Sequence, residues 1–117
     1  MEKDTVYTSE PDSVYMEGLA AIKDLDYKKA VTHLRAYKDY NAALACVLAD
    51  YNHSALEILK DLEDDAKVMY LKAIVYARLG FPEEAEAFLT RSISLDPAMK
   101  FRAGLDPELS LLTKNFK

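Results

Sequence analysis

The chain of 117 residues contains little cysteine, glycine, proline and histidine, and it contains no tryptophan. Its single cysteine, Cys46, cannot form a disulfide within the chain, so the fold must be held together by packing. With only three glycines and four prolines, half of the residues hydrophobic and 30% charged, the composition is typical of a compact helical protein and excludes a disordered segment. This length suffices for one domain with its own core.

Two further absences concern partners and membranes. Fifteen Lys and Arg residues against twenty Asp and Glu give a net charge of −5, and the basic residues form no stripe along the sequence, so we expect no binding to nucleic acid. No apolar run approaches the ~20 residues that a membrane-spanning helix needs, and the N-terminus has no signal-peptide segment. We therefore expect no membrane insertion and a cytoplasmic protein, or a periplasmic or envelope-associated one if the chain is a fragment of a larger protein.

The residue patterns of catalysis and of metal or cofactor binding are also missing. His33 and His53 have no second His or Cys at helical spacing, whereas a metal site needs three or four converging ligands. Asp50, His53 and Ser54 are the residue types of a hydrolase triad, but they fall within one helical turn, where helix capping explains them better. Glycine-rich phosphate loops are absent. We predict no catalytic residue, no metal site and no cofactor, and hence a protein that is not an enzyme.

The clearest pattern that is present is a helical hairpin over residues 73–97. Apolar or small residues recur at helical spacing before Gly80 and after Pro82. Gly80 can adopt the left-handed conformation that ends a helix, and Pro82 suits the first turn of the next helix, where no amide proton is needed. Small side chains at Ala73 and Ala85 would then let the two helices approach closely.

Pairs of small residues 12 positions apart indicate that this hairpin recurs. Each pair would place one small side chain on each helix at their contact. The pairs are Gly18 with Ala30, Ala43 with Ala55, and Ala73 with Ala85. The second pair follows the first by 25 residues and the third follows the second by 30, so the array is irregular and its helices should pack at varying angles.

These patterns predict a single domain over residues 11–117, preceded by a polar, flexible lead-in at residues 1–10. The three hairpins are expected at about residues 11–37, 39–61 and 65–95. The first two turns, at residues 24–26 and 50–52, contain no glycine and must close without it. Among the acidic residues that link the second hairpin to the third, Asp64 or Asp65 is expected to cap the next helix, with binding of a basic partner segment as the alternative.

The third hairpin resembles the tetratricopeptide repeat, a helical hairpin of 34 residues. That pattern has a small residue at position 8, an aromatic at 11, Gly at 15, Ala at 20 and Pro at 32. The residues at those positions here are Ala73, Tyr76, Gly80, Ala85 and Pro97. The resemblance covers about residues 11–97 and implies an all-α fold in which helical hairpins stack into an α-α superhelix. It also implies a concave groove, lined by the first helix of each pair, that binds a peptide or helix of a partner.

Residues 98–114 are expected to form a C-terminal cap on the last hairpin. The expected features are a short helix over residues 98–103 stopped by Gly104, then a capping helix opened by Asp106, Pro107 and Glu108 with Leu109 and Leu112 buried. A terminal element with this mixture of residues would cover the last apolar face of the array.

The resemblance also assigns residues to the groove. Position 5 of each first helix is a tyrosine, at Tyr15, Tyr40 and Tyr70, and tyrosine combines a broad apolar ring with a polar tip suited to interfaces. The other groove residues carried over are Leu19, Lys23, Leu44, Leu48, Lys67, Ile74 and Arg78. The groove would be apolar with a cationic rim, and it departs from the Lys/Asn arrangement by which some family members hold the acidic C-termini of heat-shock chaperones.

Two functions follow from the resemblance. The first is a non-catalytic protein–protein interaction module that binds a peptide or helix of a partner in the groove. The alternative is a structural or accessory domain of a larger assembly, such as a bacterial cell-envelope protein, that self-associates through the same groove as a homodimer. The lead-in or the C-terminal helix of the chain itself could also fill the groove.

Overall fold

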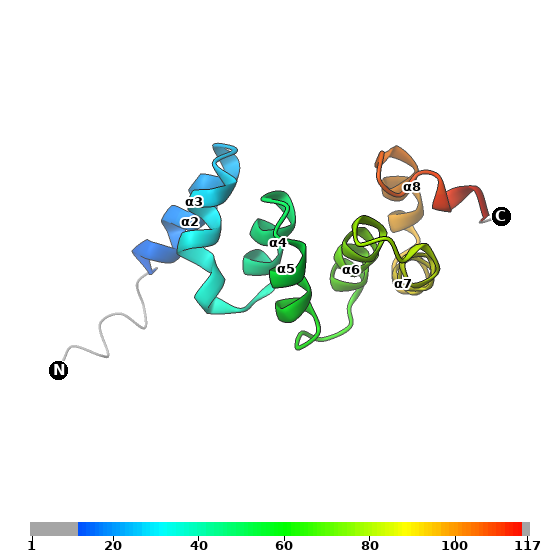
Figure 1. The fold of residues 1–117 in the computed structure, drawn as a ribbon, viewed down its shortest axis with the longest axis horizontal. Helices are drawn as coiled ribbons and strands as arrows, with labels where there is room; N and C mark the ends of the chain where they lie inside the picture. The colour runs from blue at the N-terminus through cyan, green and yellow to red at the C-terminus, as the bar shows by residue number, and fades with distance from the viewer. Residues whose placement is uncertain (1–11, 116–117) are drawn as a thin grey trace.

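The computed structural model describes residues 12–115, and the side chains of residues 12–113. This part of the chain is all-α, as predicted, with seven α-helices, two short 3-10 helices and no strand. The helices follow one another in chain order, from α2 and α3 near the N-terminal end to α7 and α8 near the C-terminal end (Figure 1). The lead-in predicted for residues 1–10 lies outside the described residues.

Consecutive helices pack against each other as three hairpins. The pairs are α2 (Ser13–Lys23) with α3 (Tyr27–Leu34), α4 (Tyr40–Leu48) with α5 (Asn52–Leu59), and α6 (Ala66–Arg78) with α7 (Pro82–Leu95). The 3-10 helix η1 (Arg35–Tyr37) joins the first pair to the second. Within residues 12–115, no helix has the length and hydrophobicity needed to span a bilayer.

Aspartates begin four of these helices. Asp12, Asp26, Asp39 and Asp65 each accept a backbone N–H from the first turn of the helix that follows, the shortest of these bonds being 2.9 Å. Such capping oxygens satisfy amide groups that have no partner within the helix, and an acidic side chain is also favoured at this end of the helix dipole. The prediction that Asp64 or Asp65 caps the third pair is confirmed for Asp65.

All three hairpin turns close in the same way, although only one contains glycine. Leu25, Asp50 and Gly80 adopt left-handed backbone conformations, with φ of 64°, 66° and 90°. In each turn the next residue donates its N–H to a carbonyl five positions earlier, from Asp26 to Ala21, Tyr51 to Cys46 and Phe81 to Tyr76, at 2.8 to 2.9 Å. The first two turns thus close without glycine by placing a leucine and an aspartate in the conformation that glycine adopts in the third.

The small residues predicted at the helix contacts are buried. Five of them are completely inaccessible to solvent: Ala30, Ala43, Ala55, Ala73 and Ala85. The sixth, Gly18, lies so close to α3 that a Cβ added there would stand 2.5 Å from Cγ of Leu34. Because a carbon cannot approach another so closely, these positions allow the paired helices to touch.

The cap differs from the prediction in two respects. Helix α8 (Ala98–Leu105) includes Gly104 and ends one residue later, since a glycine inside a helix costs only about 1 kcal/mol and does not stop it. No α-helix opens at Asp106; its side chain and carbonyl instead accept N–H groups of Glu108, Leu109 and Ser110 in a turn. The 3-10 helix η2 (Leu112–Asn115) follows. Leu109 is fully buried as expected, and Leu112 is half-buried.

Candidate partner-binding groove

The predicted groove residues lie on α2, α4 and α6, and their exposure divides them into two sets. Five of the predicted apolar residues, on α2 and α4, are half-buried, and we call this predicted set the open groove: Tyr15, Leu19, Tyr40, Leu44 and Leu48. Lys23 and Lys67 beside them are exposed. On α6, Tyr70 and Ile74 are buried and Arg78 is half-buried, and we call these three residues the covered end.

Tyr15 is anchored by its hydroxyl group between the first two hairpins. The hydroxyl donates to Oδ2 of Asp39 at 2.6 Å and accepts from Nδ2 of Asn41 at 2.8 Å. The Tyr37 ring packs edge-on against Tyr15 with the ring centroids 4.8 Å apart. Burial and the neighbouring Asp39 carboxylate both raise the pKa of Tyr15. These contacts fix the ring, so a partner would meet a preorganised aromatic surface.

Tyr40 occupies the corresponding position on α4 and contacts a basic residue of the third hairpin. Nζ of Lys67 lies 4.8 Å from the centroid of the Tyr40 ring, a cation–π geometry. Burial raises the pKa of the Tyr40 hydroxyl. An exposed lysine therefore lies beside a half-buried aromatic ring at this point.

Tyr70 does not line an open groove, and here the prediction is corrected. Its side chain is only 2% exposed, because α8 and the turn after it cover the ring. The hydroxyl donates to Oδ2 of Asp106 at 3.0 Å, and Cζ of Arg102 lies 4.7 Å from the ring centroid. Burial, followed by the hydrogen bond to Asp106, raises the pKa of Tyr70 well above its usual range.

Arg78 is a junction between three segments and not an open rim cation. Its Nε and Nη2 donate to the two carboxylate oxygens of Glu108 at 2.6 and 2.9 Å. Its Nη1 donates to the carbonyl of Val47 at 2.7 Å and to Oδ1 of Asn52 at 3.1 Å. The Glu108 carboxylate raises the pKa of Arg78. This two-pronged geometry is the strongest form of arginine–carboxylate contact, so Arg78 holds the C-terminal turn against the second and third hairpins.

The residues that cover α6 were not predicted as part of the groove. Asp106 and Glu108 were interpreted as the start of a helix, and Arg102 was assigned no role. The sequence offered the C-terminal helix as one occupant of the groove; in the structure Arg102 of α8 and the turn after α8 contact Tyr70, and that turn is not an α-helix. The available signal was the acidic Asp-Pro-Glu sequence itself, because carboxylates pair with a groove that was predicted to have basic residues.

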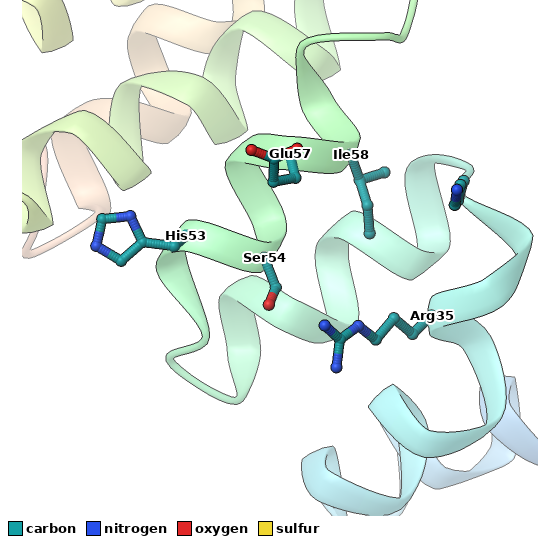
Figure 2. A pocket seen from close by; sticks show the side chains of 6 residues that line it. Arg35, His53, Ser54, Glu57 and Ile58 are labelled. Carbon is teal, nitrogen blue, oxygen red and sulfur yellow. The ribbon is translucent and has the colours of Figure 1, made fainter.

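The residues considered for catalysis or metal binding do not come together in one site. In the hollow of about 290 Å³ shown in Figure 2, the His53 side chain points away from Ser54. Asp50 does not line this hollow, and its carboxylate accepts a hydrogen bond from Asn52 at 3.0 Å. His33 lies 3.0 Å from the carbonyl of Lys29 and 3.2 Å from the Glu17 carboxylate. Among the residues that the structure describes, no group of three or more His, Cys, Asp or Glu side chains could hold a metal ion.

The open groove offers aromatic and aliphatic contact area with lysines beside it. Such a surface can bind an apolar segment and attract nearby carboxylates. Comparisons of the chain with protein-family models, curated proteins and solved structures found no match. The function must therefore be inferred from the geometry of this chain alone.

Proposed function

We propose that this protein is a tetratricopeptide-like, non-catalytic interaction module, whose open groove binds a peptide or helix of a partner protein. The observation that carries this proposal is that a segment of the chain itself, residues 106–109, occupies the equivalent positions on α6. Tyr70, Ile74 and Arg78 follow Tyr40, Leu44 and Leu48 by 30 residues each. The covered end therefore serves as an example of how this row of side chains holds another segment.

The covering segment indicates which chemistry the groove accepts. It buries one leucine, Leu109, completely and directs two carboxylates at polar groups of α6, Asp106 at the Tyr70 hydroxyl and Glu108 at Arg78. In the open groove, Lys23 precedes Leu48 by the 25 residues that separate the first two hairpins, and it is exposed. A partner with apolar side chains against Leu44 and a carboxylate near Lys23 would reproduce these contacts.

The test compares two single aromatic truncations in the full-length chain. Tyr40→Ala removes the ring at the centre of the open groove, whereas Phe101→Ala removes an aromatic that is 77% exposed on α8. Partners captured from a native lysate are titrated against both variants and the wild type. Loss of an anchor at the centre of an interface typically costs ~2 kcal/mol, about thirtyfold in affinity, so Tyr40→Ala should lose the partner and Phe101→Ala should keep it. Equal affinity of both variants for every captured partner would refute binding in the groove.

A structural domain that self-associates through its C-terminal surface, and not through the groove as the sequence suggested, is favoured by a different observation. Three large apolar residues near the C-terminal end are strongly exposed, Phe101 at 77%, Leu105 at 73% and Leu111 at 70%. Exposed apolar surface of this kind often marks a contact between subunits. Sedimentation at several protein concentrations separates the two proposals, because a tight dimer supports assembly and a monomer supports the interaction module.

A further inference from the structure

Basic side chains from distant parts of the sequence gather on the surface formed by α3, η1 and α5. Two adjoining hollows, of about 290 and 720 Å³, share Arg35 and Lys38 in their walls. Lys28 of α3 lines the larger hollow and His53 of α5 lines the smaller one. We call Lys28, Arg35, Lys38 and His53 the cationic surface. It shares no residue with the groove on α2, α4 and α6.

The charges of this surface are not neutralised by neighbouring carboxylates. Elsewhere among the described residues, Lys60, Lys72, Arg78 and Arg91 form ion pairs within 4.0 Å, whereas Lys23, Lys29 and Lys67 form none. Among the described residues, no carboxylate forms such a pair with Lys28, Arg35 or Lys38. Glu57, which also lines the smaller hollow, is paired with Lys60 at 3.5 Å. Within the described part of the chain these three cations therefore have no ion-pair partner, and a binding partner can supply negative charge.

The backbone at Lys38 supports the same conclusion. Lys38 has a left-handed conformation, with φ of 55°, immediately after η1, and its N–H donates to the carbonyl of Arg35 at 3.3 Å. This conformation costs a residue with a side chain about 1 kcal/mol, whereas glycine adopts it without penalty. A lysine at this position places a charge beside Arg35, which glycine could not do.

The hollows are also lined by apolar residues and by residues with hydroxyl groups. Val31, Ala36 and Ile58 are the apolar lining residues, and Thr32, Tyr51 and Ser54 contribute hydroxyls. Figure 2 shows Arg35 extending from η1 toward α5, with Ile58 and Ser54 on the facing helix. Two adjoining hollows of this size are larger than an isolated ion needs, whereas a peptide can extend across both and direct carboxylates to the cations.

We propose that the cationic surface binds an acidic peptide segment of a partner protein. A peptide fits better than a nucleic acid because Tyr51 and His53 are the only rings among the residues that line the hollows, so they offer no row of rings on which successive bases could stack. This site is additional to the groove, so one chain could hold two partner segments on different helices.

The test uses the full chain and a fluorescein-labelled synthetic peptide of sequence Glu-Glu-Leu-Glu-Leu-Glu-Glu, followed by fluorescence anisotropy. We expect binding that weakens as salt concentration rises, because the contacts are exposed charges. Arg35→Gln/Lys38→Gln should weaken binding by about tenfold, equivalent to ~1.4 kcal/mol. The matched variant Lys29→Gln/Arg91→Gln removes the same charge from outside both hollows and should change the affinity less than about twofold.

Three further measurements locate the site and identify the partner class. Amide NMR shifts on addition of the peptide should fall in α3, η1 and α5, and a peptide with Gln in place of Glu should not bind. A single-stranded oligonucleotide of equal length should bind more weakly than the acidic peptide. Equal losses in the two double variants, shifts confined to the open groove, or tighter binding of the oligonucleotide would each overturn the proposal.

Discussion

Four described residues adopt left-handed backbone conformations, and they differ in residue type and in the element that they end. Leu25 and Asp50 occupy the place that Gly80 holds in the third hairpin, while Lys38 ends η1. A Cβ in this conformation crowds the following carbonyl and costs about 1–2 kcal/mol. The tertiary contacts of each hairpin compensate for this cost, and the turn geometry persists although the residue type changes.

Two glycines should respond to alanine in opposite directions. A Cβ at Gly80 or Gly104 would meet no atom within 4 Å, so neither change crowds a neighbour. Gly80 has φ of 90°, and Gly80→Ala should destabilise the protein by about 1 kcal/mol. Gly104 lies inside α8, and Gly104→Ala should stabilise by about 0.5–1 kcal/mol because alanine favours helices. Urea unfolding measures the change in unfolding free energy for both variants. A change in the same direction for both would contradict the turn assigned to Gly80.

Tyr70 should make the protein sensitive to alkali. Burial and the hydrogen bond to Asp106 favour its neutral hydroxyl, so the folded pKa lies above the ordinary value of 10.0. This contribution is fully present below pH ~10 and is lost as pH rises above it, because the unfolded chain ionises first. Tyr70→Phe should therefore flatten the fall in unfolding free energy above pH ~10, while Tyr51→Phe, at an exposed ring, should keep the wild-type slope. Identical slopes in both variants would contradict the burial of Tyr70.

At the scale of the helices, the contact between α6 and α7 depends on small side chains. Ala73 and Ala85 are completely buried on facing helices, and Ser92 of α7 donates from Oγ to the carbonyl of Ala66 at 2.7 Å. The stacked rings of Tyr76 and Phe88, 5.1 Å apart, add an aromatic contact between the same two helices. Close approach along this contact leaves no space for a longer side chain.

Enlarging the buried residue of α7 should therefore destabilise the protein more than enlarging an exposed one. Ala85→Leu should cost roughly 1–3 kcal/mol, because the helices must separate to admit the leucine. Ala87 is exposed on the same helix, and Ala87→Leu should change stability by less than about 0.5 kcal/mol. Thermal unfolding of the two variants measures the difference. If Ala85→Leu unfolds at the wild-type temperature, Ala85 does not lie at the contact between α6 and α7.

At the scale of the whole molecule, the C-terminal turn joins segments that are far apart in the sequence. Glu108 pairs with Arg78, which also bonds to Val47 at the end of α4, while Asp106 bonds to Tyr70. Leu109 adds a completely buried side chain between these polar contacts. The turn thus connects the third hairpin to the second and covers one end of the groove.

Removing this turn should uncover the end of the groove. Deletion of residues 107–117 removes Leu109 and the carboxylate of Glu108, so we expect lower stability and concentration-dependent association through the exposed apolar surface. A chain that lacks only residues 112–117 retains both contacts, so its stability and its oligomeric state should be closer to those of the wild type. Light scattering and urea unfolding compare the two chains. If a chain that lacks residues 107–117 stays monomeric and is as stable as the wild type, these residues do not cover an apolar surface.

The local sequence determined the helices and their pairing, whereas only the tertiary structure decided which surfaces are open. Helical spacing, aspartate caps and small residues 12 positions apart act within one hairpin, so they can be recognised from the sequence. The burial of Tyr70 depends on Asp106, 36 residues away, and the cationic surface joins Lys28 to His53 through separate helices. Hydrophobic periodicity shows which face of a helix is apolar, but not which distant segment covers it or which separated charges become neighbours, because those contacts arise only when the helices pack.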